Sequence, residues 1–178
     1  VGGDVAQADR IVAASLTLLG RPAGSRVVTR TGARLNDWIY VTGVLGDSVR
    51  SRHHCQFTPR LAAGAWLARQ AGVRAMMDVS DGRVKDLHAL TPKRAAPAID
   101  ASAVPRRHGV SLAAALGDGE DYELVFALAS RADVGAFERR WRQAFPHTRL
   151  SCIGRFVRAG SEPAGALDLN DYRGYEHL

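Results

Sequence analysis

The sequence has few cysteines and no long apolar run. Its 178 residues include two cysteines, Cys55 and Cys152, which lie far apart and show no paired spacing. This excludes a disulfide framework and favours a reducing, cytoplasmic environment. No run approaches the roughly 20 apolar residues that a membrane-spanning helix needs. The first residues lack the charged and apolar pattern of a secretory leader, so we expect a cytoplasmic protein with no membrane partner.

Lysine is also scarce, because Lys85 and Lys93 are the only two in the chain. Lys and Arg together number 24 against 18 Asp and Glu, which gives a formal net charge of +6, nearly all of the positive part from arginine. The arginines are scattered from Arg10 to Arg173. A nucleic-acid binder usually gathers its basic residues on one stripe. We therefore expect no nucleic-acid partner and mostly solvated arginines, with phosphate-bearing small ligands as the minority alternative.

Several common catalytic motifs are absent. The chain has no G-x-x-x-x-G-K-[ST] loop, no G-x-G-x-x-G and no G-x-S-x-G. Their absence excludes a Walker-type nucleotide site, a dinucleotide-binding fingerprint and a nucleophile elbow. The sequence His53-His54-Cys55 lacks a second half at zinc-finger spacing, so a plain loop is the better interpretation. We predict no covalent nucleophile in this chain.

Alternating and helical patterns interleave along the chain. With 46% hydrophobic residues and a mean hydropathy of −0.14, the chain can bury the core of one domain. Strands are predicted at 11–19, 37–42, 75–79, 96–99, 121–129 and 150–157, and helices at 60–71, 80–90 and 134–145. Ser130 and Asp133 have the spacing of a capping box before the last helix. This order predicts an α/β or α+β sandwich.

The clearest candidate site is Met77-Asp78-Val79-Ser80-Asp81-Gly82. Asp78 ends an apolar strand, and Asp81 stands where the next helix begins. A helix N-terminus presents free backbone N–H groups and the positive end of a dipole, which suits a phosphate. Two carboxylates beside it are the oxygen ligands that Mg²⁺ shares with phosphate. The alternative is that Ser80 or Asp81 merely caps the helix, which would leave Asp78 unexplained.

Four acidic residues cluster in Gly117-Asp118-Gly119-Glu120-Asp121-Tyr122-Glu123, just before a predicted strand. One interpretation is a glycine turn whose charges lie in water. The other is a flexible acidic loop that recognises a cationic substrate group or adds a metal ligand. Taken alone, the segment favours the turn.

Glycine stands beside aspartate in two further segments, Gly2-Gly3-Asp4 and Thr42-Gly43-Val44-Leu45-Gly46-Asp47-Ser48. Glycine lets a backbone approach a phosphate closely, and aspartate can hold a metal beside it. The same pairs also occur in ordinary turns, so neither segment identifies a site by itself.

Taken in order, these motifs resemble those of the thiamine-monophosphate kinases. The most specific are D-x-S-D-G at 78–82 and G-E-D-Y-E-L at 119–124. The others are Gly3-Asp4, Arg30-Thr31-Gly32-Ala33, 37–43, Gly46-Asp47-Ser48, Asp86-Leu87, Cys152-Ile153-Gly154 and Gly174-Tyr175-Glu176-His177. Aminoimidazole ribonucleotide synthetase, selenophosphate synthetase and a hydrogenase maturation factor share the architecture of this superfamily but not both specific motifs.

The resemblance implies a domain organisation. Residues 28–178 would form the C-terminal α+β domain of the aminoimidazole ribonucleotide synthetase-like superfamily, a mixed-sheet α/β sandwich. Residues 1–27 would be the end of an N-terminal ATP-binding domain. In this family the N-terminal domain carries acidic metal ligands and forms the dimer, so we expect the full-length protein to be a homodimer.

The resemblance also implies ATP-dependent phosphorylation of thiamine monophosphate to thiamine diphosphate, with several Mg²⁺ ions between the phosphates. Carried over by motif, the ATP contacts are Gly3, Asp4, Arg30 and Ser80, the Mg²⁺ ligands are Asp4, Asp78 and Asp81, and the substrate contacts are Glu120 and Tyr175. A carboxylate and an aromatic face suit a cationic thiazolium. In-line phosphoryl transfer needs positioning and charge neutralisation rather than a covalent nucleophile.

Three residues depart from the family pattern. Asp118 stands in place of a glycine, Arg83 in place of an apolar residue, and Val5 in place of a threonine. These departures bear on efficiency more than on identity. Two other functions stay open: a non-catalytic remnant that binds thiamine phosphate or nucleotide, and a superfamily enzyme with another phosphate acceptor.

Overall fold

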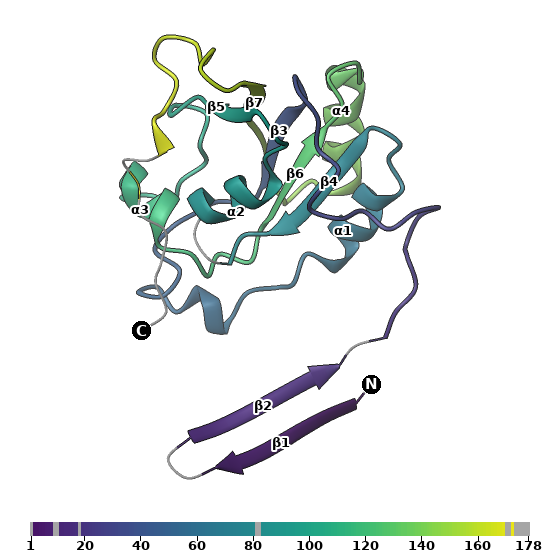
Figure 1. Ribbon diagram of the computed structural model, residues 1–178, viewed down its shortest axis with the longest axis vertical. Helices are drawn as coiled ribbons and strands as arrows, with labels where there is room; N and C mark the ends of the chain where they lie inside the picture. The colour runs from purple at the N-terminus through teal and green to yellow at the C-terminus, as the bar shows by residue number, and fades with distance from the viewer. Residues whose placement is uncertain (1, 9–10, 18, 81–82, 170–171, 173–178) are drawn as a thin grey trace.

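The computed structural model describes residues 2–8, 11–17, 19–80, 83–169 and 172, with the backbone alone for 2–8, 11–15 and 83–84. Its centre is a five-stranded sheet with the spatial order β4-β6-β3-β7-β5 (Figure 1). These strands are β3 (Trp38–Thr42), β4 (Val73–Asp78), β5 (Ala95–Ile99), β6 (Leu124–Leu128) and β7 (Leu150–Arg158). All of their pairings are antiparallel, and the parallel pairing among the described residues is an isolated bridge between Leu45 and Arg106.

Side chains of the central strands alternate between two separate apolar cores. In β3, Ile39 and Val41 lie in one core, whereas Tyr40 lies in the other. In β6, Val125 faces the first core and Phe126 the second. This alternation follows from the two-residue period of a strand. Because both faces are covered, β3 and β6 are almost entirely buried.

Helices form a layer on each face of the sheet (Figure 1). The helices α1 (Leu61–Ala68) and α4 (Val134–Ala144) contribute side chains to the core around Tyr40. The helices α2 (Arg83–Leu90) and α3 (Leu112–Gly117) contribute to the opposite core. The expected α+β sandwich is thereby confirmed.

A hairpin precedes the main body. Its strands are β1 (Gly2–Ala8) and β2 (Ile11–Thr17), which pair antiparallel, with Asp4 opposite Ser15. Figure 1 shows the hairpin standing away from the main sheet. The segment Gly2-Gly3-Asp4 is therefore part of a paired strand rather than a turn.

The predicted strands and helices are all present, with shifted ends. The strand predicted at 121–129 begins only at Leu124, because Glu120 and Tyr122 take left-handed φ values of 57° and 52°. The capping-box prediction is wrong, since Asp133 itself caps α4 by accepting a hydrogen bond from the Ala136 N–H. The sequence patterns missed β1, α3 and a short 3₁₀ turn, η1 (His53–Cys55).

Candidate functional site

Three loops leave the same end of the main sheet. Residues 43–48 follow β3, residues 79–80 follow β4, and residues 118–123 precede β6. They converge because β6 runs antiparallel to both neighbours, so that the start of β6 meets the ends of β3 and β4. Residues 78–80 of the first specific motif and residues 119–124 of the second are thus at one end of the fold, although they are distant in the sequence.

Backbone hydrogen bonds join these two motifs directly. The Val79 N–H donates to the Glu123 carbonyl at 2.8 Å, and the Tyr122 N–H donates to the Val79 carbonyl at 2.9 Å. The Glu120 N–H donates to the Ser80 carbonyl at 2.8 Å. Ser80 and Glu120, predicted from separate motifs, are therefore held side by side.

The acidic loop also binds the glycine–aspartate loop after β3. The Gly46 N–H donates to both carboxylate oxygens of Asp121 at 3.0 Å, and the Asp47 N–H donates to Asp118 Oδ2 at 3.0 Å. Asp121 is 1% exposed, so its charge does not lie in water as the turn interpretation expected. Asp118, the departure from the family's glycine, thereby satisfies a backbone donor of the neighbouring loop.

Glu123 is a second buried acid of the loop. Its carboxylate accepts hydrogen bonds from Arg60 Nε and Nη2 at 2.8 and 2.6 Å, and from Thr42 Oγ1 at 2.6 Å. A Cβ on Gly43, which has a φ of +63°, would lie 1.9 Å from Glu123 Oε1. Gly43 is therefore needed for two reasons, the left-handed backbone and the close approach of this carboxylate.

Glu120 differs from its neighbours, since its side chain is only half-buried. Its carboxylate accepts a 2.5 Å hydrogen bond from the Tyr122 hydroxyl. The Tyr122 ring stacks on Phe57 with a centroid separation of 4.2 Å and an interplanar angle of 16°. Left-handed backbone at both Glu120 and Tyr122 is costly for residues with side chains and is often found at functional sites.

An apolar cavity of about 470 Å³ lies against this aromatic pair. Its lining includes Phe57, Pro59, Leu61, Tyr122 and Leu124, and Asp78 also lines it. Asp78 is exposed, and its carboxylate forms no hydrogen bond or ion pair with another described residue. The cavity therefore combines an apolar wall, aromatic rings and an available carboxylate, a composition suited to an organic ligand.

Two pKa values reflect this environment. The hydrogen bond to Glu120, together with burial and the nearby negative charges of Glu120 and Asp78, raises the pKa of Tyr122 to about 12. Burial lowers the pKa of His53, and the positive charge of Arg107 acts in the same direction. Neutral tyrosine and neutral histidine are therefore favoured beside the acidic loop.

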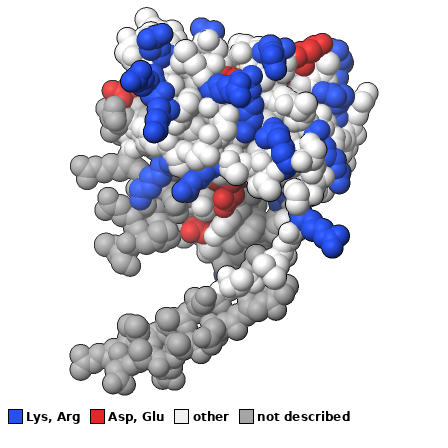
Figure 2. Space-filling view, turned by 45° about the vertical axis from the view of Figure 1, so that its right-hand side comes forward, with Lys and Arg blue, Asp and Glu red and all other residues white. Residues whose placement is uncertain are grey.

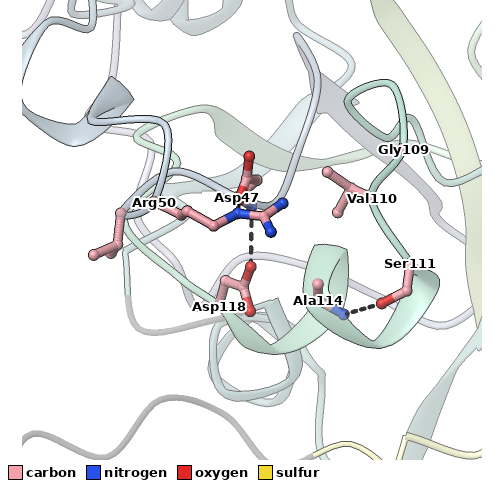
Figure 3. Close-up of a pocket in the computed structure, with 8 residues that line it drawn as sticks. Asp47, Arg50, Gly109, Val110, Ser111, Ala114 and Asp118 are labelled. Atoms are coloured by element: carbon pink, nitrogen blue, oxygen red, sulfur yellow. Dashed lines mark hydrogen bonds and ion pairs between the residues drawn. The ribbon is translucent and has the colours of Figure 1, made fainter.

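A second cavity, of about 570 Å³, is lined in part by the loop that contains Asp47 (Figure 3). Asp47, Arg50 and Asp118 point toward one another on one side of it, and Val110 and Ser111 lie on the other. Arg50 Nε lies 2.5 Å from Asp47 Oδ1. Since both acids in this cavity are already bonded within the protein, the cavity at Asp78 is the better candidate site.

The structure brings together only part of the predicted site. Asp78, Ser80 and Glu120 meet at one end of the sheet. The Thr29 carbonyl accepts a hydrogen bond from the Met76 N–H. The backbone of Arg30, the next residue, therefore lies close to the free edge of β4. Gly3 and Asp4 lie in the separate hairpin, whereas Asp81 and Tyr175 lie outside the described residues.

Sequence analysis missed three residues of this region. Phe57 and Tyr122 form its aromatic wall, and Arg60 holds Glu123 in place. For Tyr122 the signal was its position inside the acidic motif. Phe57 and Arg60 had no comparable signal, because their roles depend on contacts with residues more than sixty positions away.

The described side chains offer only part of a metal site. No group of three or more His, Cys, Asp or Glu side chains suited to a metal ion occurs within the described part of the chain. Asp78 offers a hard oxygen ligand of the kind Mg²⁺ prefers, and such sites are commonly completed by phosphate oxygens. The described residues thus fit part of a magnesium site.

Among the described helices, none is long and apolar enough to cross a membrane.

Curated relatives carry one name. The chain is 31% identical to the thiamine-monophosphate kinase of Salmonella typhimurium, in a match that covers 100% of this chain and 63% of that protein. It is 34% identical to the thiamine-monophosphate kinase of Rhodopirellula baltica over 72% of this chain and 43% of that protein. The chain therefore spans less than two thirds of the length of these relatives. No family model matches the chain.

Solved structures agree with these matches. The thiamine-monophosphate kinase from Stenotrophomonas maltophilia superposes with a TM-score of 0.60 at 25% identity, covering 74% of this chain and 51% of that one. The structure of AaThiL complexed with AMPPCP and TMP superposes with a TM-score of 0.56 at 24% identity, covering 87% of this chain and 55% of that one. The expected resemblance is confirmed: over its whole length, this chain is a relative of the thiamine-monophosphate kinases.

Proposed function

We propose that this chain is the C-terminal part of an enzyme that transfers the γ-phosphoryl group of ATP to thiamine monophosphate. The terminal phosphate oxygen of thiamine monophosphate attacks the γ-phosphorus and ADP leaves, which yields thiamine diphosphate. The observation that carries this proposal is the set of hydrogen bonds that hold Val79 and Ser80 against residues 120–123. The names of the relatives, and the ATP analogue and TMP in the AaThiL complex, support the same reaction.

The roles of the residues are part of the proposal. Asp78 and Asp81, with Asp4, would hold Mg²⁺, which when bound supplies charge neutralisation between the phosphates. Gly3, Asp4, Arg30 and Ser80 would contact ATP. Glu120 and Tyr175 would contact thiamine monophosphate. The exposed Asp78 carboxylate at the end of β4 supports the first of these roles.

The aromatic wall fits the thiamine part of the substrate. Thiamine has a cationic thiazolium ring, and a cation is attracted to a carboxylate and to the face of an aromatic ring. Glu120 and the stacked rings of Phe57 and Tyr122 offer both features beside an apolar cavity. We include Phe57 and Tyr122 among the proposed substrate contacts.

The remaining parts of the proposal concern the whole protein. Residues 1–27 would belong to an N-terminal ATP-binding domain, and residues 28–178 would form the second domain. We further propose that the full-length protein is a cytoplasmic homodimer. The fact that the chain covers 63% of a relative's length supports the existence of a further domain in the relatives.

The test is an assay of the full-length protein with ATP, Mg²⁺ and thiamine monophosphate, with thiamine diphosphate measured by chromatography. Asp78→Asn should lower kcat/KM by about 100-fold or more, because a charge that faces the transferring phosphates is lost. Glu162→Gln, which changes an exposed acid in a distant turn, is the control and should keep full activity. Undiminished turnover by the Asp78 variant would disprove its assignment as a metal ligand.

The same assay separates the two alternatives. Saturable binding of thiamine monophosphate without product would support a non-catalytic binding protein. Phosphorylation of an aminoimidazole or selenium substrate, with thiamine monophosphate inert, would support another branch of the superfamily. Either result would overturn the proposed reaction.

A further inference from the structure

A basic cavity lies at the end of the sheet opposite the candidate site. Its volume is about 590 Å³, and its lining includes Arg69, Arg74, Arg131 and Arg140. In the pair formed by β4 and β6, Val73 lies opposite Leu128 at this end, whereas Asp78 lies opposite Leu124 at the other. The two sites are therefore separated by the length of these strands. We refer to this site as the arginine cavity.

Two of these arginines already have partners. Arg74 Nη1 donates to the fully buried Asp37 carboxylate at 2.9 Å, and Arg69 Nε donates to the Ala23 carbonyl at 3.0 Å. The ion pair fixes the direction of the Arg74 guanidinium, because Asp37 Oδ1 also accepts the Ser130 N–H at 3.2 Å. Arg74 is therefore held in a fixed orientation among the residues that line the cavity.

The other two arginines have no counter-charge. Arg131 and Arg140 are exposed, and neither forms a hydrogen bond or an ion pair with another described residue. The acid that lines the cavity is Asp133, whose Oδ1 is occupied by the Ala136 N–H. Of the four arginines that line the cavity, Arg74 is paired with Asp37, and the other three share the cavity with the carboxylate of Asp133. A bound anion would relieve the repulsion that remains among them.

The N-terminal end of α4 adds to this positive potential. Asp133 is the N-cap of this 11-residue helix, and Arg131 precedes it by two residues. The first turn of a helix carries the positive end of the helix dipole, where cations are unfavourable and anions are stabilised. The basic residues are therefore placed where a bound anion would gain from both the arginines and the helix.

From these features, we propose that the arginine cavity binds a small ligand that carries two or more phosphate groups. Planar guanidinium groups bind phosphate through paired hydrogen bonds, and the volume lies within the usual range for small-molecule pockets. A nucleic acid is a less suitable ligand, because proteins that bind one usually present an extended basic stripe with aromatic side chains for base stacking. On the face shown in Figure 2, basic side chains are spread widely, with few acidic ones among them. This inference does not depend on the proposed kinase function.

The test is calorimetric titration of the protein with inorganic pyrophosphate and tripolyphosphate. The double variant Arg131→Gln/Arg140→Gln should weaken binding at least about tenfold, or about 1.4 kcal/mol. The double variant Arg155→Gln/Arg158→Gln removes the same charge from exposed positions on β7 and should bind as the unmodified protein does. NMR should locate the ligand through shifts of the backbone N–H signals of residues 131–136.

Four outcomes would overturn the proposal. The first two are the absence of saturable binding and an equal loss of affinity in the two double variants. The third is that the N–H shifts are confined to residues 79–80 and 118–123, and the fourth is that a single-stranded oligonucleotide binds more tightly and displaces pyrophosphate. The third would assign the phosphate site to the end of the sheet that contains Asp78. The last would identify the surface as a nucleic-acid site instead.

Discussion

Arg60 and Glu123 form a two-pronged ion pair at the end of the sheet, with N···O separations of 2.8 and 2.6 Å. The Glu123 side chain is 3% exposed and that of Arg60 26%. Arg60 immediately precedes α1 and Glu123 immediately precedes β6, so the pair ties the helix layer to the loops of the candidate site.

Removal of Arg60 should destabilise the fold strongly. In Arg60→Ala, the buried Glu123 carboxylate would lose its counter-charge, which we expect to lower the free energy of unfolding by about 3 kcal/mol or more. Arg50→Ala breaks a solvent-exposed ion pair with Asp47 and should change the free energy of unfolding little. Urea denaturation of both variants measures the difference. Similar stability in the two would show that the Glu123 pair is not important for the fold.

Gly46 should tolerate alanine less well than Gly165 does. Both have left-handed backbone, with φ values of +83° and +85°, and the left-handed conformation costs a non-glycine residue about 1–2 kcal/mol. A Cβ on Gly46 would also lie 2.7 Å from Val110 Cγ1 and 2.8 Å from Ala115 Cα, whereas nothing lies within 4 Å at Gly165. Gly46→Ala should therefore cost about 1–3 kcal/mol more than Gly165→Ala. Equal melting temperatures would contradict this prediction.

The Tyr122 hydroxyl should ionise at about pH 12 instead of near 10. Because the folded state holds this proton more tightly than the unfolded state, the stabilisation from the Tyr122 contact is complete below pH 10 and is lost as the pH rises toward 12. In Glu120→Gln, the pKa should fall toward its ordinary value. Ultraviolet absorbance at high pH follows the titration, and Tyr122→Phe identifies the signal. An unchanged titration in the Glu120 variant would rule out Glu120 as the main cause.

Asp118 should stabilise the loop that contains Asp47. Asp118→Ala removes the acceptor of the Asp47 N–H, and a hydrogen bond to a charged group contributes about 1.5–3 kcal/mol. Asp118→Asn keeps a side-chain oxygen at this position and should lose less. Hydrogen exchange of the Asp47 N–H is the direct measurement. Equal protection in the two variants would show that the carboxylate does not hold this loop.

Strands and helices were predicted well where the spacing of apolar residues indicated which side chains are buried. The alternation of Leu124, Phe126 and Leu128 identified a strand, and the stripe of Phe137 and Trp141 identified a helix, because each pattern reports which side chains face a core. The ends were less accurate. The left-handed backbone of Tyr122 shortens β6, and nothing in residue type requires it there.

Residues of the candidate site were predicted only in part. Asp78 stood out because it is an acid at the end of an apolar strand, whereas the roles of Ser80 and Glu120 were implied by the resemblance of their motifs to those of the thiamine-monophosphate kinases. The partnership of Arg60 with Glu123 could not be predicted, since it depends on the strand order that places β6 between β4 and β3. The internal use of Asp118 and Asp121 also depends on loops that meet only in the folded chain.

The strand order also determines when the sheet can form during synthesis. Each strand pair of the five-stranded sheet includes either β6 or β7, the last two strands in the described part of the chain. When β3, β4 and β5 leave the ribosome, they have no partner within that sheet, and β6 begins only at Leu124. Pairing between residues distant in sequence is slow, and unpaired strand edges favour aggregation. Nascent chains that end before Leu124 should therefore need chaperone protection, and pulse proteolysis of stalled ribosome complexes would detect their lack of a folded sheet.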